Sequence, residues 1–189
     1  MSMTGWQHPR ANIMSRVLIV GSGGREHAIV WAIQNTAVTP VEIFCAPGNA
    51  GIGQIAQMVN ISADDQIGLA SFAESNKIDL TFVGPEAPLA AGIVDLFTDK
   101  GLAIVGPDAA AARLEGSKIF AKDFMARHKV PTAAYRVAES AEQALEYLRS
   151  GEFGSEVVIK ADGLAAGKGV VVAGNHAEAE RADRGERLR

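Results

Sequence analysis

The sequence has little cysteine, no long hydrophobic segment and no excess of basic residues. Its one cysteine, Cys45, cannot form an internal disulfide and is best explained as a small buried apolar residue. No apolar run approaches the ~20 residues of a membrane helix, and the first residues lack the hydrophobic block of a signal peptide. The net charge of −4 and the lack of a basic patch argue against nucleic acid. We therefore expect a cytoplasmic protein without a membrane or nucleic-acid partner.

Length and composition indicate the number of domains. The 189 residues, of which 48% are hydrophobic, are enough for one domain plus part of another. Residues 1–14 are polar and aperiodic, and they are expected to form a disordered leader. Residues 176–189 contain almost no large apolar side chain, which predicts a disordered polar tail.

A glycine-rich turn near the start organises the rest of the sequence. Residues 17–20 are apolar and predict a buried strand, the glycine-rich residues 21–24 predict a turn, and the apolar residues that follow recur at helical spacing. A helix that begins in this way presents free N–H groups to an anion. A dinucleotide fingerprint would need a third glycine where Glu26 stands and an acidic residue after the next strand. We therefore interpret the loop as a phosphate or phosphosugar cradle with Arg25 as its cationic clamp, and a glycine turn that only packs is the alternative.

Strands and helices alternate as far as residue 115. Further strands are predicted at 41–45, 78–83 and 102–105, and helices at 64–77, at 89–100 and from 109. This alternation predicts an α/β fold with a doubly wound parallel sheet and right-handed crossovers. Loops 46–53 and 84–89 follow the carboxyl ends of two strands, where such sheets bind ligands. Asp64 and Asp65 are explained as residues of a helix start and not as a catalytic pair.

From Gly116 the pattern changes, and a second domain is predicted to begin. Within residues 157–172, two β-branched runs flank a glycine-rich loop, and this arrangement predicts a flap. A Walker loop would need glycine in place of Asp162, serine or threonine in place of Gly169, and a helix afterwards. The flap can close its N–H groups over triphosphate oxygens while Lys160 and Lys168 supply positive charge. A solvated hairpin tip is the alternative.

Five motifs, taken together, are typical of one family. They are Val-Gly-Ser-Gly-Gly-Arg-Glu-His-Ala at 20–28, Ala-Pro-Gly-Asn-Ala-Gly at 46–51, Gly-Pro-Glu-Ala-Pro-Leu at 84–89, Gly-Ser-Lys-Ile-Phe-Ala-Lys at 116–122 and Lys-Ala-Asp-Gly-Leu-Ala-Ala-Gly-Lys-Gly at 160–169. Because the five motifs occur in the family's order, the chain resembles the glycinamide ribonucleotide synthetases. These are the phosphoribosylamine–glycine ligases of the ATP-grasp superfamily. The resemblance extends from about residue 14 to residue 173.

The resemblance implies a fold and a reaction. Residues 15–115 would form a Rossmann-like, substrate-binding pre-ATP-grasp domain, and residues 116–175 would form the start of an ATP-grasp domain. In purine biosynthesis the family joins glycine to 5-phosphoribosylamine, while ATP is hydrolysed to ADP and phosphate. Glycine is first phosphorylated, and the amine then attacks the acyl phosphate. The implied partners are phosphoribosylamine, glycine and ATP, and a monomer is expected.

The resemblance also implies two sets of binding residues. The phosphoribosyl substrate would be held by Gly21, Gly23, Gly24, Arg25, Glu26, Gly48, Asn49, Gly84, Pro85, Glu86 and Pro88. ATP would be held by Lys118, Lys160, Gly163, Leu164, Gly167, Lys168 and Gly169. The family's magnesium or manganese ligands belong to a part of the ligase that this sequence does not match, so no metal ligand and no catalytic residue is named. The chain is accordingly expected to be a truncated or frameshifted product that is inactive alone.

Three other functions stay open from the sequence. Another ATP-grasp ligase with a similar N-terminal domain is one, although the run Arg25-Glu26-His27 favours the glycine ligase. A stand-alone domain that binds a phosphoribosyl metabolite is the second. An NAD-dependent oxidoreductase is the third, and the missing third glycine and ribose-binding acid argue against it.

Overall fold

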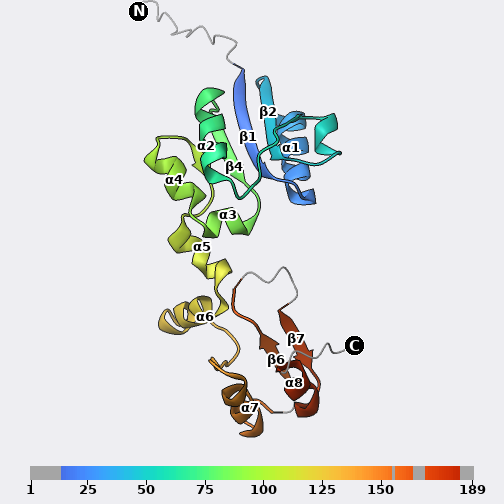
Figure 1. Ribbon diagram of the computed structural model, residues 1–189, viewed down its shortest axis with the longest axis vertical. Coiled ribbons are helices and arrows are strands. Elements are labelled where there is room, and N and C mark those ends of the chain that lie inside the picture. Colours follow the sequence, from blue (N-terminus) through green and yellow to red (C-terminus); the bar gives the residue numbers. More distant parts are fainter. Residues whose placement is uncertain (1–13, 155, 164–168, 184–189) are drawn as a thin grey trace, which may run out of the picture. The chain divides into compact units, whose positions relative to one another are not determined.

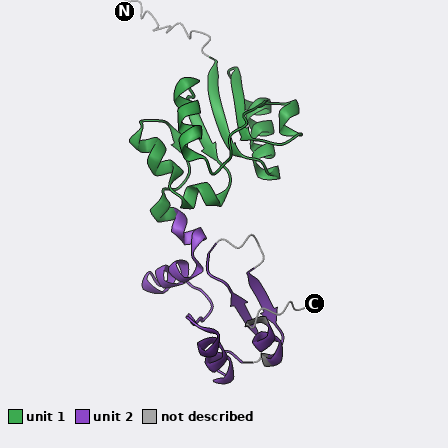
Figure 2. Cartoon of the chain, in the orientation of Figure 1, with its two compact units in different colours: residues 1–111 green, residues 112–189 purple. Residues whose placement is uncertain are grey.

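The structure, a computed structural model, describes residues 14–154, 156–163 and 169–183 and divides into two compact units (Figures 1 and 2). Unit 1 comprises residues 1–111 and unit 2 comprises residues 112–189. The strands and helices that begin in unit 1 are β1 (Ser15–Gly21), α1 (Gly24–Thr36), β2 (Val41–Pro47), the 3-10 helix η1 (Ile52–Gln54), β3 (Gln57–Met58), α2 (Gln66–Ser75), β4 (Leu80–Val83), α3 (Glu86–Ala90), α4 (Ile93–Asp99), β5 (Ile104–Val105) and α5 (Ala109–Gly116).

Unit 1 is built on a five-stranded sheet with β1 at its centre. The strand order is β3-β2-β1-β4-β5, and every neighbouring pair is parallel. Leu18 of β1 lies opposite Phe44 of β2 on one side and Thr81 of β4 on the other. The chain therefore leaves β1 toward one edge and later returns to its other side, which opens a crevice at the carboxyl ends of β1 and β4.

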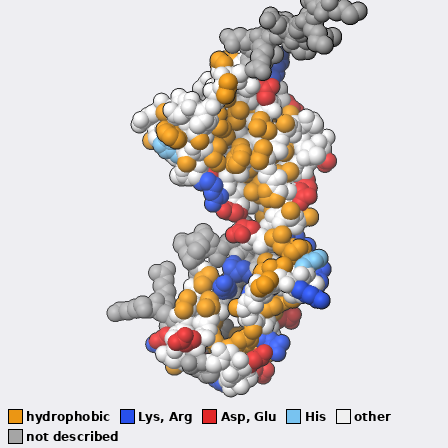
Figure 3. All heavy atoms as spheres, turned by 180° about the vertical axis from the view of Figure 1, so that it is seen from behind, with side chains coloured by type: hydrophobic (Ala, Val, Ile, Leu, Met, Phe, Trp, Pro, Cys, Tyr) orange, Lys and Arg blue, Asp and Glu red, His pale blue; other side chains and the backbone are white. Residues whose placement is uncertain are grey.

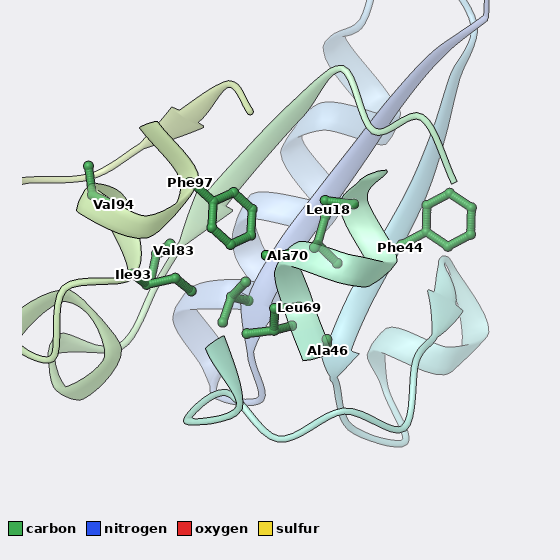
Figure 4. Packing of buried hydrophobic residues seen from close by; sticks show 11 residues of the cluster. Leu18, Phe44, Ala46, Leu69, Ala70, Val83, Ile93, Val94 and Phe97 are labelled. Carbon is green, nitrogen blue, oxygen red and sulfur yellow. The ribbon is translucent and has the colours of Figure 1, made fainter. Parts of the chain in front are cut away.

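Helices cover both faces of this sheet because β1 is apolar at every position along its centre. Leu18 packs with residues of α2 and α4, including Leu69 and Phe97, as Figure 4 shows, and Val20 belongs to the same cluster. Ile19 points to the opposite face and packs with residues of α1 and η1. All five strands are parallel and both faces carry helices, so the prediction of a doubly wound α/β sheet is confirmed.

Two local predictions for unit 1 differ from the structure. The helix expected over 89–100 is instead the pair α3 and α4, separated by Gly92, whose φ of +92° lies in the left-handed region. The two-residue strand β3 was not predicted, because Gln57 and Met58 are both exposed and carry no alternating pattern. Both differences involve backbone geometry that hydrophobic spacing does not report.

Unit 2 contains helices around a two-stranded hairpin. Its elements are α6 (Lys118–Arg127), α7 (Ala141–Arg149), β6 (Val157–Lys160), β7 (Val170–Ala173) and α8 (His176–Asp183), and β6 pairs antiparallel with β7. Leu148, Ala173 and Ala179 form its small core. The two β-branched runs thus form a hairpin, as expected for a flap.

The expectation of a disordered tail from residue 176 is wrong for residues 176–183. This segment forms α8, which buries Ala179 against α7 and the hairpin. An ion pair at 3.1 Å joins Arg149 of α7 to Glu180. The Asn175 side chain also caps the helix by accepting from the Glu178 amide at 2.9 Å, so local capping and the burial of Ala179 together order a segment whose composition predicts disorder.

Hydrophobic side chains also reach the surface. On the face seen in Figure 3 they gather over part of unit 1, with acidic and basic side chains around them. Among the exposed ones are Trp31 of α1 and Ile67 of α2. None of the helices in the described ranges is both long and apolar enough to cross a membrane.

Candidate functional site

The loops after β1 and β4 line one cleft of about 530 Å³ in unit 1. Eight of its lining residues belong to the predicted substrate set: Gly21, Gly23, Gly24, Arg25, Glu26, Pro85, Glu86 and Pro88. Ser22, Ala87, Ala63 and Asp64 complete the lining. The predicted residues Gly48, Asn49 and Gly84 are not part of this lining. Two loops that lie 60 residues apart in the sequence therefore meet because their strands are adjacent in the sheet.

The side chain of Glu26 fills the space that Gly21, Gly23 and Gly84 leave. Its side chain turns back from the first turn of α1, is only 5% exposed, and accepts a hydrogen bond of 2.5 Å from the Gly23 amide. A Cβ on Gly84 would overlap Glu26 Oε1, and a Cβ on Gly21 would lie 2.7 Å from Glu26 Cγ. The glycines are thus required by a carboxylate of the protein. The Gly23 amide is already bonded to a negative group, and the interpretation of the loop as a phosphate cradle stays a prediction.

Arg25 is also paired within the protein. Its guanidinium donates to the carbonyl oxygen of Gly84 and forms an ion pair of 3.0 Å with Glu86 Oε1. The clamp expected from the sequence therefore joins the β1 loop to the β4 loop. A phosphate at this arginine would have to compete with Glu86.

The environment of Glu86 gives a testable pKa. Its own backbone amide, at the start of α3, and the Arg25 guanidinium hold the pKa of Glu86 below its usual value. We expect Arg25→Ala to raise the pKa of Glu86 part of the way back, because the backbone hydrogen bond remains. A carboxyl-carbon NMR titration of both proteins measures this shift, with Glu74 as an internal reference. An unchanged pKa would show that the ion pair does not persist in solution.

The loop after β2 is fixed to the glycine turn by Asn49. Its amide nitrogen donates to the Ser22 carbonyl at 2.8 Å, and its oxygen accepts from the amides of Gly51 and Ile52. The imidazole of His27 lies against Gly51, where an added Cβ would be 2.7 Å from its Cε1 atom. The predicted substrate residue Asn49 thus orders the loop that contains Gly48.

Cys45 is buried at the end of β2, as predicted. Its thiol donates to the Gly21 carbonyl at 3.4 Å. Burial, and secondarily the Glu26 carboxylate, raise the pKa of Cys45 to about 11. The thiol therefore stays protonated at neutral pH, which makes it a poor nucleophile.

In unit 2, Asp162 fixes the root of the hairpin loop to the start of α6. Its carboxylate accepts hydrogen bonds from the hydroxyl of Ser117 at 3.1 Å and from the amides of Lys118 at 2.7 Å and Ile119 at 3.2 Å. Burial acts to raise the pKa of Asp162, but the hydrogen bonds from the backbone and from Ser117 outweigh it and lower this pKa. The ammonium of Lys118 donates to the Gly163 carbonyl at 2.8 Å. Asp162 therefore occupies the position where a helix N-terminus would otherwise attract an anion.

The remaining predicted ATP residues lie on or beside the hairpin. Lys160 ends β6 and is exposed, and Gly169 precedes β7, where its carbonyl accepts from the Ala161 amide at 2.7 Å. Leu164, Gly167 and Lys168 lie outside the described residues. Among the predicted ATP residues that the structure describes, Lys118 and Gly163 are joined by this hydrogen bond.

Comparison with known proteins identifies the family. The model for the N domain of phosphoribosylglycinamide synthetase matches residues 15–115, and the model for its ATP-grasp (A) domain matches residues 116–185. The chain belongs to the phosphoribosylglycinamide synthetase family. The two models follow one another in the expected order, which confirms a Rossmann-like domain followed by the start of an ATP-grasp domain.

Curated relatives in this family are named phosphoribosylamine–glycine ligase. The Pseudomonas aeruginosa protein is 57% identical over 173 residues, which are 89% of this chain and 39% of the relative. The Escherichia coli K12 protein is 56% identical over 170 residues, with 88% and 39% covered. The chain thus spans about two fifths of the length of the curated relatives it matches.

Solved structures of low sequence identity share the fold of this chain. An ADP complex of N5-carboxyaminoimidazole ribonucleotide synthetase has a TM-score of 0.72 at 19% identity and covers 91% of this chain and 45% of that one. The biotin carboxylase domain of Hydrogenobacter thermophilus 2-oxoglutarate carboxylase has a TM-score of 0.67 at 20% identity, covering 89% and 39%.

Sequence reasoning missed one residue of the cleft and misjudged another. Asp64 lines the cleft, whereas only Asp65 caps α2, through a bond of 2.9 Å from the Gly68 amide to its Oδ1. Two adjacent acids before a helix carry no signal that separates the cap from the cleft residue. Glu26 stands where a dinucleotide motif would have glycine, and the space that Gly21, Gly23 and Gly84 leave for its side chain could be recognised only in the fold.

Proposed function

We propose that the chain provides the substrate-binding domain, residues 15–115, and the start of the ATP-grasp domain, residues 116–175, of a phosphoribosylamine–glycine ligase. The reaction joins the carboxyl group of glycine to the amine of 5-phosphoribosylamine in purine biosynthesis. The observation that carries this proposal is the identity of 57% over 173 residues with a ligase of that name. The cytoplasmic location and the monomeric state stay predictions from the sequence.

The proposed reaction has two steps. ATP transfers its γ-phosphoryl group to the glycine carboxylate, giving ADP and an acyl phosphate. The amine of phosphoribosylamine then attacks the acyl carbon, phosphate leaves, and the amine loses a proton as the amide forms. In this proposal, phosphoribosylamine binds near the loops after β1 and β4, and ATP binds near Lys118 and Lys160.

A solved neighbour supports ATP as the nucleotide, since its complex contains ADP. Magnesium or manganese would neutralise charge on the transferred phosphoryl group. Within the ranges that the structure describes, no group of three or more His, Cys, Asp or Glu side chains is placed to hold such an ion. We therefore assign no residue of this chain to the metal.

The proposal is tested by grafting. Residues 15–173 of this chain replace the matching segment of the Pseudomonas aeruginosa relative, and ADP release is measured with ATP, glycine and phosphoribosylamine. We expect turnover that requires both glycine and phosphoribosylamine. Lys118→Ala in the graft should raise the KM for ATP by about 10-fold or more, the value of a lost charge-assisted hydrogen bond.

The outcomes separate the candidate functions. A folded graft that binds ATP but shows no glycine-dependent ADP release would contradict the proposal. Turnover that accepts a different carboxylate or amine in place of the two substrates would favour another ATP-grasp ligase. The control is Lys129→Ala, which removes an exposed lysine from the same unit. It should leave the KM for ATP unchanged.

A further inference from the structure

Two lysines, Lys118 and Lys122, lie one helical turn apart on α6 and have different partners. Residues four apart share a face of a helix, so either ammonium group could meet a ligand on that face. The Lys118 ammonium donates to the Gly163 carbonyl at the root of the hairpin loop. The Lys122 ammonium instead donates to Thr132 Oγ1 at 2.7 Å and to the Ala133 carbonyl at 3.0 Å. Lys122 therefore binds the segment that follows the helix.

Tyr135 strengthens the attachment of α6 to this segment. The Lys122 ammonium lies 5.5 Å from the centroid of the Tyr135 ring, within the range of a cation–π contact. The Tyr135 hydroxyl donates to Asp123 Oδ1 at 2.7 Å, and this hydrogen bond to a carboxylate raises the pKa of Tyr135. Two neighbouring side chains of α6 thus hold residues 132–135.

The position of α6 depends on polar contacts, because none of its side chains is buried in the described structure. At the start of the helix, the Asp162 carboxylate accepts from the amides of Lys118 and Ile119. One turn later, Lys122 and Asp123 make the contacts with residues 132–135. Loss of the Lys122 contacts should therefore shift the helix without opening a hydrophobic core.

We propose that Lys122 is a positioning residue, which holds α6 where Lys118 can meet ATP. The inference rests on the proposed function, which gives Lys118 a role in ATP binding. Lys122 contacts the protein and not the nucleotide, since its ammonium is bonded to Thr132 and Ala133. Its effect on ATP therefore passes through Lys118.

A double-mutant cycle distinguishes positioning from direct contact with ATP. Calorimetry measures the affinity of the full 189-residue chain for ATP. Lys122→Met removes the ammonium and keeps an unbranched side chain, and it should weaken binding by about 3- to 10-fold. Lys118→Ala should weaken binding by about 10-fold or more. In the Lys118→Ala background, Lys122→Met should cause no further loss, because the group that it positions is already absent.

Two control variants and one structural measurement accompany the cycle. Lys122→Arg keeps a charged donor and should retain most of the affinity for ATP. Arg127→Met removes a cation from the same helix, where its guanidinium bonds the Asp123 carbonyl at 3.4 Å, and should bind ATP as the unsubstituted chain does. Hydrogen exchange of the Lys118 amide should be unchanged in Lys122→Met, because the bond of this amide to Asp162 remains.

Additive losses in the double variant would overturn the inference, since Lys122 would then act on ATP independently of Lys118. Unchanged affinity of Lys122→Met, weaker affinity accompanied by faster exchange of the Lys118 amide, or no binding of ATP to the unsubstituted chain would also overturn it. Additive losses together with a graft that turns over would leave the ligase proposal standing. Non-additive losses together with a graft that lacks glycine-dependent turnover would overturn the ligase proposal and leave Lys122 as a positioning residue for ATP.

Discussion

Gly84→Ala should lower the free energy of unfolding of unit 1 by about 3 kcal/mol, because the added methyl group meets a buried carboxylate. The new Cβ would overlap Glu26 Oε1 and lie 2.6 Å from its Cδ atom. The Glu26 side chain cannot simply swing aside, since it is buried and the Gly23 amide is bonded to it. The substitution therefore overpacks the crevice and strains a partly buried hydrogen bond. Urea unfolding followed by circular dichroism measures the loss.

Two further variants separate this mechanism from a general loss of backbone freedom. Gly24→Ala lies in the same loop, where an added Cβ has no atom within 4 Å in the described structure, and it should be nearly neutral. In the double variant Gly84→Ala with Glu26→Ala, the methyl group gains space, so the combined cost should be smaller than the sum of the two single costs. Additive costs would show that Gly84 is required for another reason.

Asp162→Ala should destabilise the start of α6 by about 1–2 kcal/mol, the cost of losing a helix cap, discounted because the carboxylate is exposed. Three donors, the Ser117 hydroxyl and the amides of Lys118 and Ile119, lose their acceptor. Hydrogen exchange of these two amides should accelerate by about 5- to 30-fold. Asp162→Asn keeps a neutral acceptor and should cost less, and Glu146→Ala in α7 is the exposed acidic control.

The hydrogen bonds of Asp162 also predict how the stability of the chain depends on pH. The pKa of Asp162 is lowered in the folded chain, so its stabilising contribution is complete above the ordinary aspartate value of 3.8. That contribution is lost as the pH falls below 3.8 and through the lowered pKa. The difference in stability between the original chain and Asp162→Ala should therefore shrink on acidification below 3.8. A difference that stays constant would show that Asp162 acts without its charge.

Much of the fold could be predicted because its signals are local. The buried strand at Leu18–Val20, the turn at Gly21 and the start of α2 after two acids each depend on residues within a few positions of one another. The break at Gly92 and the strand β3 were missed, since one depends on a backbone angle and the other on pairing with β2. The helix α8 was missed because its composition is polar, although Asn175 caps its start and Ala179 packs against α7 and the hairpin.

The sequence by itself determined the alternation of strands and helices, the family motifs and the two loops on which the site is built. Only the tertiary structure decided what the polar side chains of those loops do. Arg25 reaches Gly84 and Glu86, 59 and 61 residues away, and Asp162 reaches Lys118 across 44 residues. Arg25 is a residue type that binds phosphate, but here it pairs with Glu86, because the sheet brings that carboxylate beside it. Local spacing cannot report that change, because charge pairing depends on distance in space and not on separation along the chain.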